Sequence, residues 1–205
     1  MIPDMHCKDE IVRDLEERED FITDEIMLRW FRERYSTSKH LLTLYSIAIG
    51  LRPKKIVEIG FGRSSFVLAK AAEETGAKLY CCDRYDYTGY LSDKEKEIIT
   101  FIHGDGKKAM EIMKGVDFLF LDYFSTIKRS AESIVKEVNK YIPLLKKNGI
   151  IAIHDSIEKK YFVRKAMKAL RGNVEIMNLP YNYGLALIRC LKNDNGTLKD
   201  GWFRK

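Results

Sequence analysis

The stretch VEIGFGRSS, residues 57–65, decides the fold. It begins inside an apolar run, KIVEIG at residues 55–60, and leads into a run with helical spacing at residues 64–77. Gly60 and Gly62 permit positive φ angles and a close approach of the backbone to a ligand. A strand, a glycine turn and a helix in this order are typical of folds that bind a dinucleotide or a nucleoside, and the stretch alone leaves that choice open.

Apolar runs and helical runs alternate through the rest of the chain. This alternation predicts an α/β fold with a parallel sheet and helices on both faces. The last two apolar runs, VEIMNLP and GLALIRCLK, are joined only by YNY, so they must pair antiparallel as a hairpin. The five expected parallel strands are residues 55–60, 78–83, 100–105, 116–122 and 150–155.

The length of the chain, 205 residues, predicts a single domain. Before the first strand, helical spacing predicts two helices within residues 8–35 and another at 38–51, with Ser38 as its N-cap. The expected parts of the domain are an N-terminal helical cap, a cofactor-binding core and a polar tail: residues 1–50, 51–192 and 193–205.

Charge and composition limit the classes of partner. The net charge of +6 suits nucleic acid or an anionic substrate, but the basic residues are spread over helical segments and predict solvated faces. The four cysteines form neither a CxxC motif nor a Cys/His zinc spacing, which favours a reduced, cytoplasmic protein. No run approaches the ~18 apolar residues of a membrane span, so we expect no membrane partner.

Acidic residues follow the expected strands. Ligands in open α/β sheets bind beyond the carboxyl ends of the strands, where these acids gather. Asp83 is placed to accept both hydroxyls of a ribose, and Asp105 to accept from an amino group of a base. The acids at the five strand ends are Glu58, Asp83, Asp105, Asp122 and Asp155.

Three features favour a nucleoside over a dinucleotide. Glu58 stands two residues before the first glycine, the third strand ends in HGD, and the chain closes its sheet with a hairpin. All three are unusual in nicotinamide-binding folds. A nicotinamide oxidoreductase therefore stays a less favoured alternative.

Five motifs, VEIGFGRSS, CCD, HGDGKKAM, VDFLFLD and NGIIAIHD, resemble in order and spacing those of class I S-adenosylmethionine-dependent methyltransferases. The resemblance covers roughly residues 50–192. It implies a Rossmann-like three-layer sandwich whose seven-stranded, mostly parallel sheet has an antiparallel last strand. It also implies S-adenosylmethionine as cofactor and S-adenosylhomocysteine as product.

The resemblance assigns cofactor contacts to the strand ends. The glycine loop would line the methionine end, Asp83 would bind the ribose, and Asp105 with its neighbouring glycines would flank the adenine. Ser64 stands where the family has a third glycine, a departure that concerns the geometry of the loop. The implied cofactor-binding set is Glu58, Gly60, Phe61, Gly62, Ser64, Asp83, Arg84, Gly104, Asp105, Gly106, Asp122 and Tyr123.

Two segments, FLFLDYFST and PLLKKNGIIAIHDS, are most similar to small-molecule O-methyltransferases of the catechol type and to their relatives near cephalosporin biosynthesis. This likeness implies a hydroxyl, or an amine, of a small molecule as methyl acceptor. It also implies Mg²⁺ at Asp122, Asp155 and Ser156, where the ion would lower the pKa of the acceptor hydroxyl. Ser156 replaces the family's Asn, and Ser125 replaces the Lys expected as base.

Several of these residues also have a structural interpretation. DSIE, residues 155–158, forms a capping box if Asp155 is the N-cap of the next helix. His154 is a candidate general base, predicted together with Asp122 as a catalytic residue, or a packed histidine at a strand end with a backbone partner. Tyr123 covers the cofactor or acceptor, or forms an aromatic shelf over the sheet edge.

Two further segments have alternative interpretations. RWFRERYSTSKH, residues 29–40, fits a stacking surface for nucleic acid, an amphipathic helix packed on the sheet, or a cap over the active site as in the catechol-type relatives. LPYNYG, residues 179–184, lines the acceptor pocket or forms a plain β-turn.

The functional prediction is a methyltransferase with a small-molecule acceptor, and a homo-oligomer is compatible with it. The first alternative is an RNA methyltransferase, which the basic charge favours. Against it, LDYF lacks the Asn/Asp-Pro-Pro-aromatic signature of many base N-methylating enzymes. The second alternative is a non-catalytic nucleotide-binding protein with the same fold.

Overall fold

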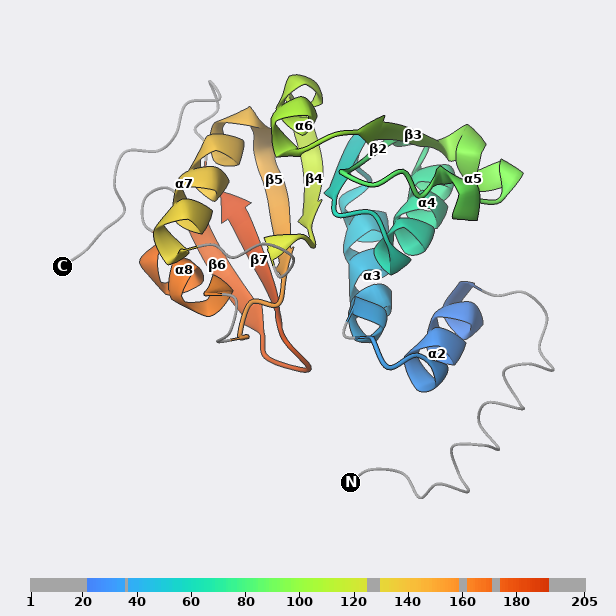
Figure 1. The fold of residues 1–205 in the computed structure, drawn as a ribbon, viewed down its shortest axis with the longest axis horizontal. Helices are drawn as coiled ribbons and strands as arrows, with labels where there is room; N and C mark the ends of the chain where they lie inside the picture. Colours follow the sequence, from blue (N-terminus) through green and yellow to red (C-terminus); the bar gives the residue numbers. More distant parts are fainter. Residues whose placement is uncertain (1–21, 36, 125–129, 159–161, 171–173, 192–205) are drawn as a thin grey trace, which may run out of the picture.

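The protein is described by a computed structural model that covers residues 22–35, 37–124, 130–158, 162–170 and 174–191. Its centre is a seven-stranded sheet in the order β3-β2-β1-β4-β5-β7-β6 (Figure 1). β7 is antiparallel to both of its neighbours, and the remaining strand pairs of the described sheet are parallel, as the sequence predicted. The strands are β1 Lys55–Ile59, β2 Lys78–Asp83, β3 Ile99–His103, β4 Val116–Leu121, β5 Leu145–His154, β6 Val174–Leu179 and β7 Leu185–Cys190.

Helices cover both faces of the sheet (Figure 1). The apolar side chains of the strands alternate, so Phe118 and Phe120 pack with α3 and α4 while Leu119 and Leu121 pack with α7 and α8. This arrangement confirms the three-layer sandwich. The helices are α2 Ile22–Arg32, η1 Thr37–His40, α3 Leu41–Leu51, α4 Arg63–Thr75, η2 Thr88–Tyr90, α5 Asp93–Ile98, α6 Gly106–Ile112, α7 Ala131–Tyr141, η4 Ile142–Leu144 and α8 Val163–Ala169.

The N-terminal helical extension is present where the chain is described. α2 and α3 fall within the segments expected to be helical, whereas the first helix expected within 8–35 and the tail 193–205 lie outside the described residues. Ser38 is not the N-cap of α3, because it lies inside the 3₁₀ turn η1 and His40 holds the cap position. None of the described helices is long and apolar enough to cross a membrane.

The segment after β5 differs most from the prediction. Residues 155–157 form a turn, and α8 begins only at Val163. Asp155 has a φ of 58°, a left-handed conformation, so it is not the N-cap of a helix and the predicted capping box is wrong. A polar side chain such as Asp tolerates this conformation, which turns the chain sharply at the end of the strand.

Candidate functional site

The glycine loop connects β1 to α4 and rests against the neighbouring strand β4. Gly60 has a φ of 98°, and a Cβ there would lie 2.4 Å from the carbonyl oxygen of Asp122. The position therefore requires glycine for both its conformation and its close backbone approach. Gly62 has a φ of 179° and open space around it, so the predicted need for positive φ holds at Gly60 alone.

Glu58 lies beneath this loop rather than on its surface. Its carboxylate is fully buried and accepts hydrogen bonds from the hydroxyls of Ser64 and Ser65 and from the thiol of Cys81. Burial raises the pKa of Glu58 to about 7, against the opposing effect of these three donors. The residue therefore fixes the first turn of α4, and its contact with a cofactor stays a prediction.

Asp83 connects the glycine loop to the segment that follows β2. One carboxylate oxygen accepts from the backbone N–H of Phe61 at 2.9 Å and the other from that of Tyr85 at 2.9 Å. The adjacent Arg84 accepts, through its carbonyl, a contact of 2.7 Å from His103 Nε2. The N–H of Gly104 donates to the carbonyl of Asp83 at 2.8 Å, so the predicted ribose and adenine positions adjoin one another.

A cavity of about 650 Å³ opens on the α2 side of the glycine loop. Phe61, Gly62 and Ser65 form its loop wall, and Tyr87 lies on its lining. This volume is within the range of small-molecule sites. Asp83 is absent from its described lining, so the cavity meets only part of the predicted cofactor set.

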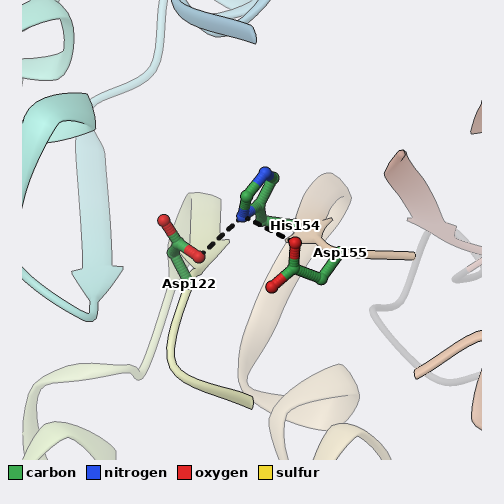
Figure 2. Close-up of side chains that lie close together, drawn as sticks. All are labelled: Asp122, His154 and Asp155. Carbon is green, nitrogen blue, oxygen red and sulfur yellow. Dashed lines mark hydrogen bonds and ion pairs between the residues drawn. The ribbon is translucent and has the colours of Figure 1, made fainter. Parts of the chain in front are cut away.

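Asp122, His154 and Asp155 form one cluster at the ends of β4 and β5 (Figure 2). His154 Nδ1 lies 2.8 Å from Asp122 Oδ1 and 3.5 Å from Asp155 Oδ1. The two carboxylates thus share one imidazole nitrogen, and the second ring nitrogen lies on the opposite side of the ring (Figure 2). The histidine is 3% exposed. This juxtaposition places the predicted catalytic residues His154 and Asp122 in direct contact.

The contact between Asp122 and His154 determines which of the two groups carries a proton. Burial acts to raise the pKa of Asp122, but the charge and hydrogen bond of His154 outweigh it and leave that pKa lowered. Burial likewise acts to lower the pKa of His154, but the charge and hydrogen bond of Asp122 outweigh it and leave that pKa raised. Asp122 is therefore an ionised acceptor, and His154 carries its proton on Nδ1.

The 3₁₀ turn η1 supplies two residues that the sequence interpretation did not assign. Thr37 Oγ1 donates to Asp122 Oδ2 at 2.8 Å. The ring of His40 meets that of His154 edge-to-face, with centres 5.2 Å apart, and lies 4.6 Å from the ring of Tyr181. Burial, and then the charge of His154, lower the pKa of His40 to about 4, so its ring is neutral. The sequence signal that could have indicated these two residues is STSKH, residues 36–40, within the segment interpreted as a cap over the active site.

Tyr123 points its hydroxyl toward α7. The hydroxyl donates to Glu137 and lies 3.2 Å from the hydroxyl of Tyr141. Its ring packs on Phe124, with centres 4.6 Å apart. These contacts match the aromatic shelf, whereas a contact with the cofactor or acceptor stays a prediction.

The predicted Mg²⁺ ligands do not all converge. Asp122 and Asp155 belong to the cluster, but Ser156 donates its hydroxyl to Asn178 Oδ1 on β6. The third group between the carboxylates is the imidazole of His154, and Mg²⁺ takes oxygen ligands. Asp122 and Asp155 could therefore supply the two carboxylates of an Mg²⁺ site that keeps several waters, whereas Ser156 is turned toward β6, and the Mg²⁺ site itself stays a prediction.

Comparisons with known proteins agree with this fold. Residues 57–156 match the family model described as a methyltransferase domain. No curated protein matches the chain. The fold is that of the class I methyltransferases, which confirms the resemblance carried by the motifs.

Solved structures share this fold along most of the chain. A Podospora anserina methyltransferase with S-adenosylhomocysteine bound is 17% identical, with a TM-score of 0.60 over 93% of this chain and 98% of its own. A putative caffeoyl-CoA O-methyltransferase from Staphylococcus aureus is 17% identical, with a TM-score of 0.62 over 90% and 99%. A putative rRNA-methylase from Clostridium thermocellum is 14% identical, with a TM-score of 0.57 over 77% and 98%. At such identities the likeness establishes the fold.

Proposed function

We propose that the protein transfers the methyl group of S-adenosylmethionine to a hydroxyl, or an amine, of a small molecule. The observation that carries this proposal is the Asp122–His154 pair beside the glycine loop. His154 Nδ1 is held by Asp122, while its Nε2 is buried without a hydrogen-bond partner among the described residues. The backbone of Asp122 packs against Gly60, so this pair adjoins the proposed cofactor loop.

The reaction needs a nucleophile and a place for its proton. The acceptor oxygen attacks the methyl carbon, the carbon–sulfur bond breaks, and S-adenosylhomocysteine leaves. The proton of the acceptor hydroxyl passes to His154 Nε2, and the carboxylate of Asp122 stabilises the resulting imidazolium. The protein also lowers the barrier by holding both reactants in line and by excluding water.

The cofactor would lie across the strand ends that the motifs indicated. Backbone around Gly60 and Gly62 would contact the methionine end, and Asp83 would accept from the ribose hydroxyls. Asp105 would flank the adenine. Support comes from the closeness of these segments, since the N–H of Phe61 already bonds to Asp83 and Gly104 follows on the next strand.

The acceptor would approach from the side of η1 and the β6–β7 turn. Thr43 Oγ1, in the first turn of α3 directly after η1, lies 2.5 Å from the Tyr181 hydroxyl, so the start of α3 meets the β6–β7 turn. His40 lies between Tyr181 and His154. The burial of His154 favours a small acceptor over a folded RNA.

Calorimetric titration with S-adenosylhomocysteine tests the cofactor part of the proposal. We expect wild-type protein to bind and Asp83→Asn to bind at least about tenfold more weakly, because one acceptor of the ribose hydroxyls is lost. Asp93→Asn is the matched control, since Asp93 is fully exposed on α5 and should leave binding unchanged. Absence of heat with both S-adenosylmethionine and its product would refute methyl transfer, and heat with NAD(H) alone would indicate an oxidoreductase.

A second assay addresses the acceptor. Release of S-adenosylhomocysteine is followed with a panel of small hydroxylated compounds and amines, and separately with bulk RNA at several salt concentrations. Turnover confined to the small compounds supports the proposal. Turnover on RNA with steeply salt-dependent binding would favour the RNA alternative. Tight cofactor binding without turnover on any acceptor would favour a non-catalytic nucleotide-binding protein.

A further inference from the structure

The amino ends of the parallel strands form the edge of the sheet opposite the proposed active site. Lys54 precedes β1, Lys78 begins β2, and Lys114 lies shortly before β4. Arg52 caps the C-terminus of α3 beside them. We infer that these cations bind the phosphate backbone of a double-stranded nucleic acid. Together they are the basic edge: Arg52, Lys54, Lys78 and Lys114.

Backbone contacts bring the members of the basic edge together. β1 lies between β2 and β4 in the sheet. The N–H of Lys78 donates to the carbonyl of Lys54 at 3.0 Å. On the other side of β1, Lys55 Nζ donates to the carbonyl of Lys114 at 3.0 Å. The members come from separate segments of the chain, so the sequence shows scattered basic residues that only the fold collects.

The charges of the basic edge are unpaired in the described part of the chain. All four residues are exposed, and no carboxylate there lies within ion-pair distance of their side chains. Lysines on the α4–α5 surface differ, since Lys70 Nζ and Lys94 Nζ lie 3.1 Å and 2.8 Å from the carboxylate of Glu73. The basic edge therefore presents positive charge that the protein itself does not neutralise.

Acidic residues nearby do not cancel this charge. The carboxylate of Asp117 accepts from the N–H groups of Lys54 and Lys55, each at 2.9 Å. The same oxygen lies 3.0 Å from Lys146 Nζ, which matches its charge. This side of the sheet holds six basic and three acidic residues, an excess of three positive charges: Arg52, Lys54, Lys55, Lys78, Lys114 and Lys146 against Glu74, Glu111 and Asp117.

The other edge of the sheet has the opposite charge. Asp83, Asp122 and Asp155 lie at or just after the carboxyl ends of β2, β4 and β5. A polyanion is therefore attracted to the amino edge and repelled from the proposed active site. Its binding at the basic edge is independent of methyl transfer.

The spacing of the strands fits a phosphate backbone. Neighbouring strands lie ~4.8 Å apart, so the row from β2 across β1 and β4 to Lys146 on β5 spans about 14 Å. One strand of a double helix presents about four phosphates over this length. The four unpaired cations thus meet about as many phosphates.

The side chains around the basic edge favour a double helix over other anionic surfaces. Proteins that bind single strands stack the bases on aromatic rings, but the exposed aromatic residues of the described segments lie on the carboxyl side of the sheet or on α2 and the residues after it. Stable membrane binding needs apolar insertion besides charge, and Leu51 is the only exposed large apolar side chain that adjoins this edge among the residues described. Contact with phosphates, without base recognition, is the chemistry that remains.

Fluorescence anisotropy of short labelled duplexes, RNA and DNA of one sequence, measures binding by the full-length protein between about 50 and about 200 mM salt. We expect both duplexes to bind, with log K falling against log salt concentration with a slope of about −3.6 for four phosphate contacts. The more tightly bound duplex identifies the source of the backbone. Lys54→Gln/Lys78→Gln/Lys114→Gln should reduce the slope to about −0.9 and weaken binding at least about tenfold, whereas Lys78→Gln alone should reduce the slope by about 0.9.

A charge-matched variant tests whether net charge alone gives the same result. Lys70→Gln/Lys94→Gln/Lys96→Gln removes three positive charges from the α4–α5 surface and should keep the wild-type slope and affinity. S-adenosylhomocysteine binding and the thermal melt should be unchanged in every variant, and loss of cofactor binding with duplex binding retained would refute the proposed function alone. No duplex binding by wild type, equal weakening in both triple variants, or tighter binding to polyuridylate, polyglutamate or phosphatidylserine vesicles than to the duplexes would overturn the inference.

Discussion

The buried carboxyl of Glu58 should make the stability of the fold depend on pH in a direction opposite to that of most acidic residues. Its pKa rises from an ordinary 4.5 to about 7 on folding, so the folded protein holds this proton more tightly than the unfolded chain does. Its stabilising contribution is complete below the unfolded pKa and is lost as the pH rises through the folded one. A pKa change of this size corresponds to about 3 kcal/mol.

The perturbation that isolates this effect is Glu58→Gln. Glutamine keeps the shape and an oxygen that accepts from Ser64 or Ser65, but it does not titrate. Urea unfolding of both proteins is measured at intervals from about pH 5 to about pH 8. The free energy of unfolding of wild type should fall by about 2.5 kcal/mol more than that of the variant over this range. Histidine titrations contribute equally to both proteins, so the difference belongs to Glu58.

A control and a contrary result complete this test. Glu97→Gln changes an exposed carboxyl on α5 and should retain the wild-type pH dependence. Parallel curves for wild type and Glu58→Gln would show that the buried carboxyl is ionised throughout. In that case the hydrogen bonds from Ser64, Ser65 and Cys81 would outweigh the desolvation of the carboxylate, and the argument from burial would be refuted.

Three other predictions concern the loop, the cluster and a helix cap. Gly60→Ala should lower the free energy of unfolding by at least ~2 kcal/mol and weaken S-adenosylhomocysteine binding, because its Cβ meets the Asp122 carbonyl. Gly62→Ala should leave the free energy of unfolding nearly unchanged, and urea unfolding of both variants, with calorimetry for Gly60→Ala, checks these outcomes. Thr37→Val should lower the free energy of unfolding, measured with urea, by about 1.5 kcal/mol, since Asp122 loses a hydrogen bond. A change near zero would show that water replaces the hydroxyl. Ser92→Ala should lower the free energy of unfolding by about 1 kcal/mol in the same assay, because Ser92 is the N-cap of α5. An unchanged urea midpoint would contradict that role.

The sequence was informative where local pattern and strand ends decide the structure. KLYCCD forms β2 with the expected bounds, and the carboxyl ends of the parallel strands do bring Asp83, Asp122 and His154 to one edge of the sheet. The short link YNY correctly predicted the antiparallel pairing of β6 and β7. These features depend on periodicity and chain connectivity, which a single sequence contains.

Contacts between side chains that are far apart in the sequence could not be predicted from periodicity and connectivity. Ser156 bonds to Asn178 on β6, and no local pattern relates the two positions. Glu58 was expected beside a ligand, yet its burial depends on where α4 and Cys81 of β2 pack. The left-handed conformation of Asp155 depends on the close approach of the 183–184 backbone, whose carbonyls accept from Ile157 and Ser156.

The position of η1 has a consequence for how proteins with this domain diverge. The segment that matches the methyltransferase family, residues 57–156, holds the glycine loop and the Asp122–His154 pair, whereas His40 and Tyr181 lie on either side of it in the chain. The aromatic rings over His154, with His40 against it and Tyr181 against His40, therefore come from two segments outside the glycine loop. Mutations in η1 and in the β6–β7 turn can change the chemistry presented to an acceptor while the inherited core of the domain stays intact.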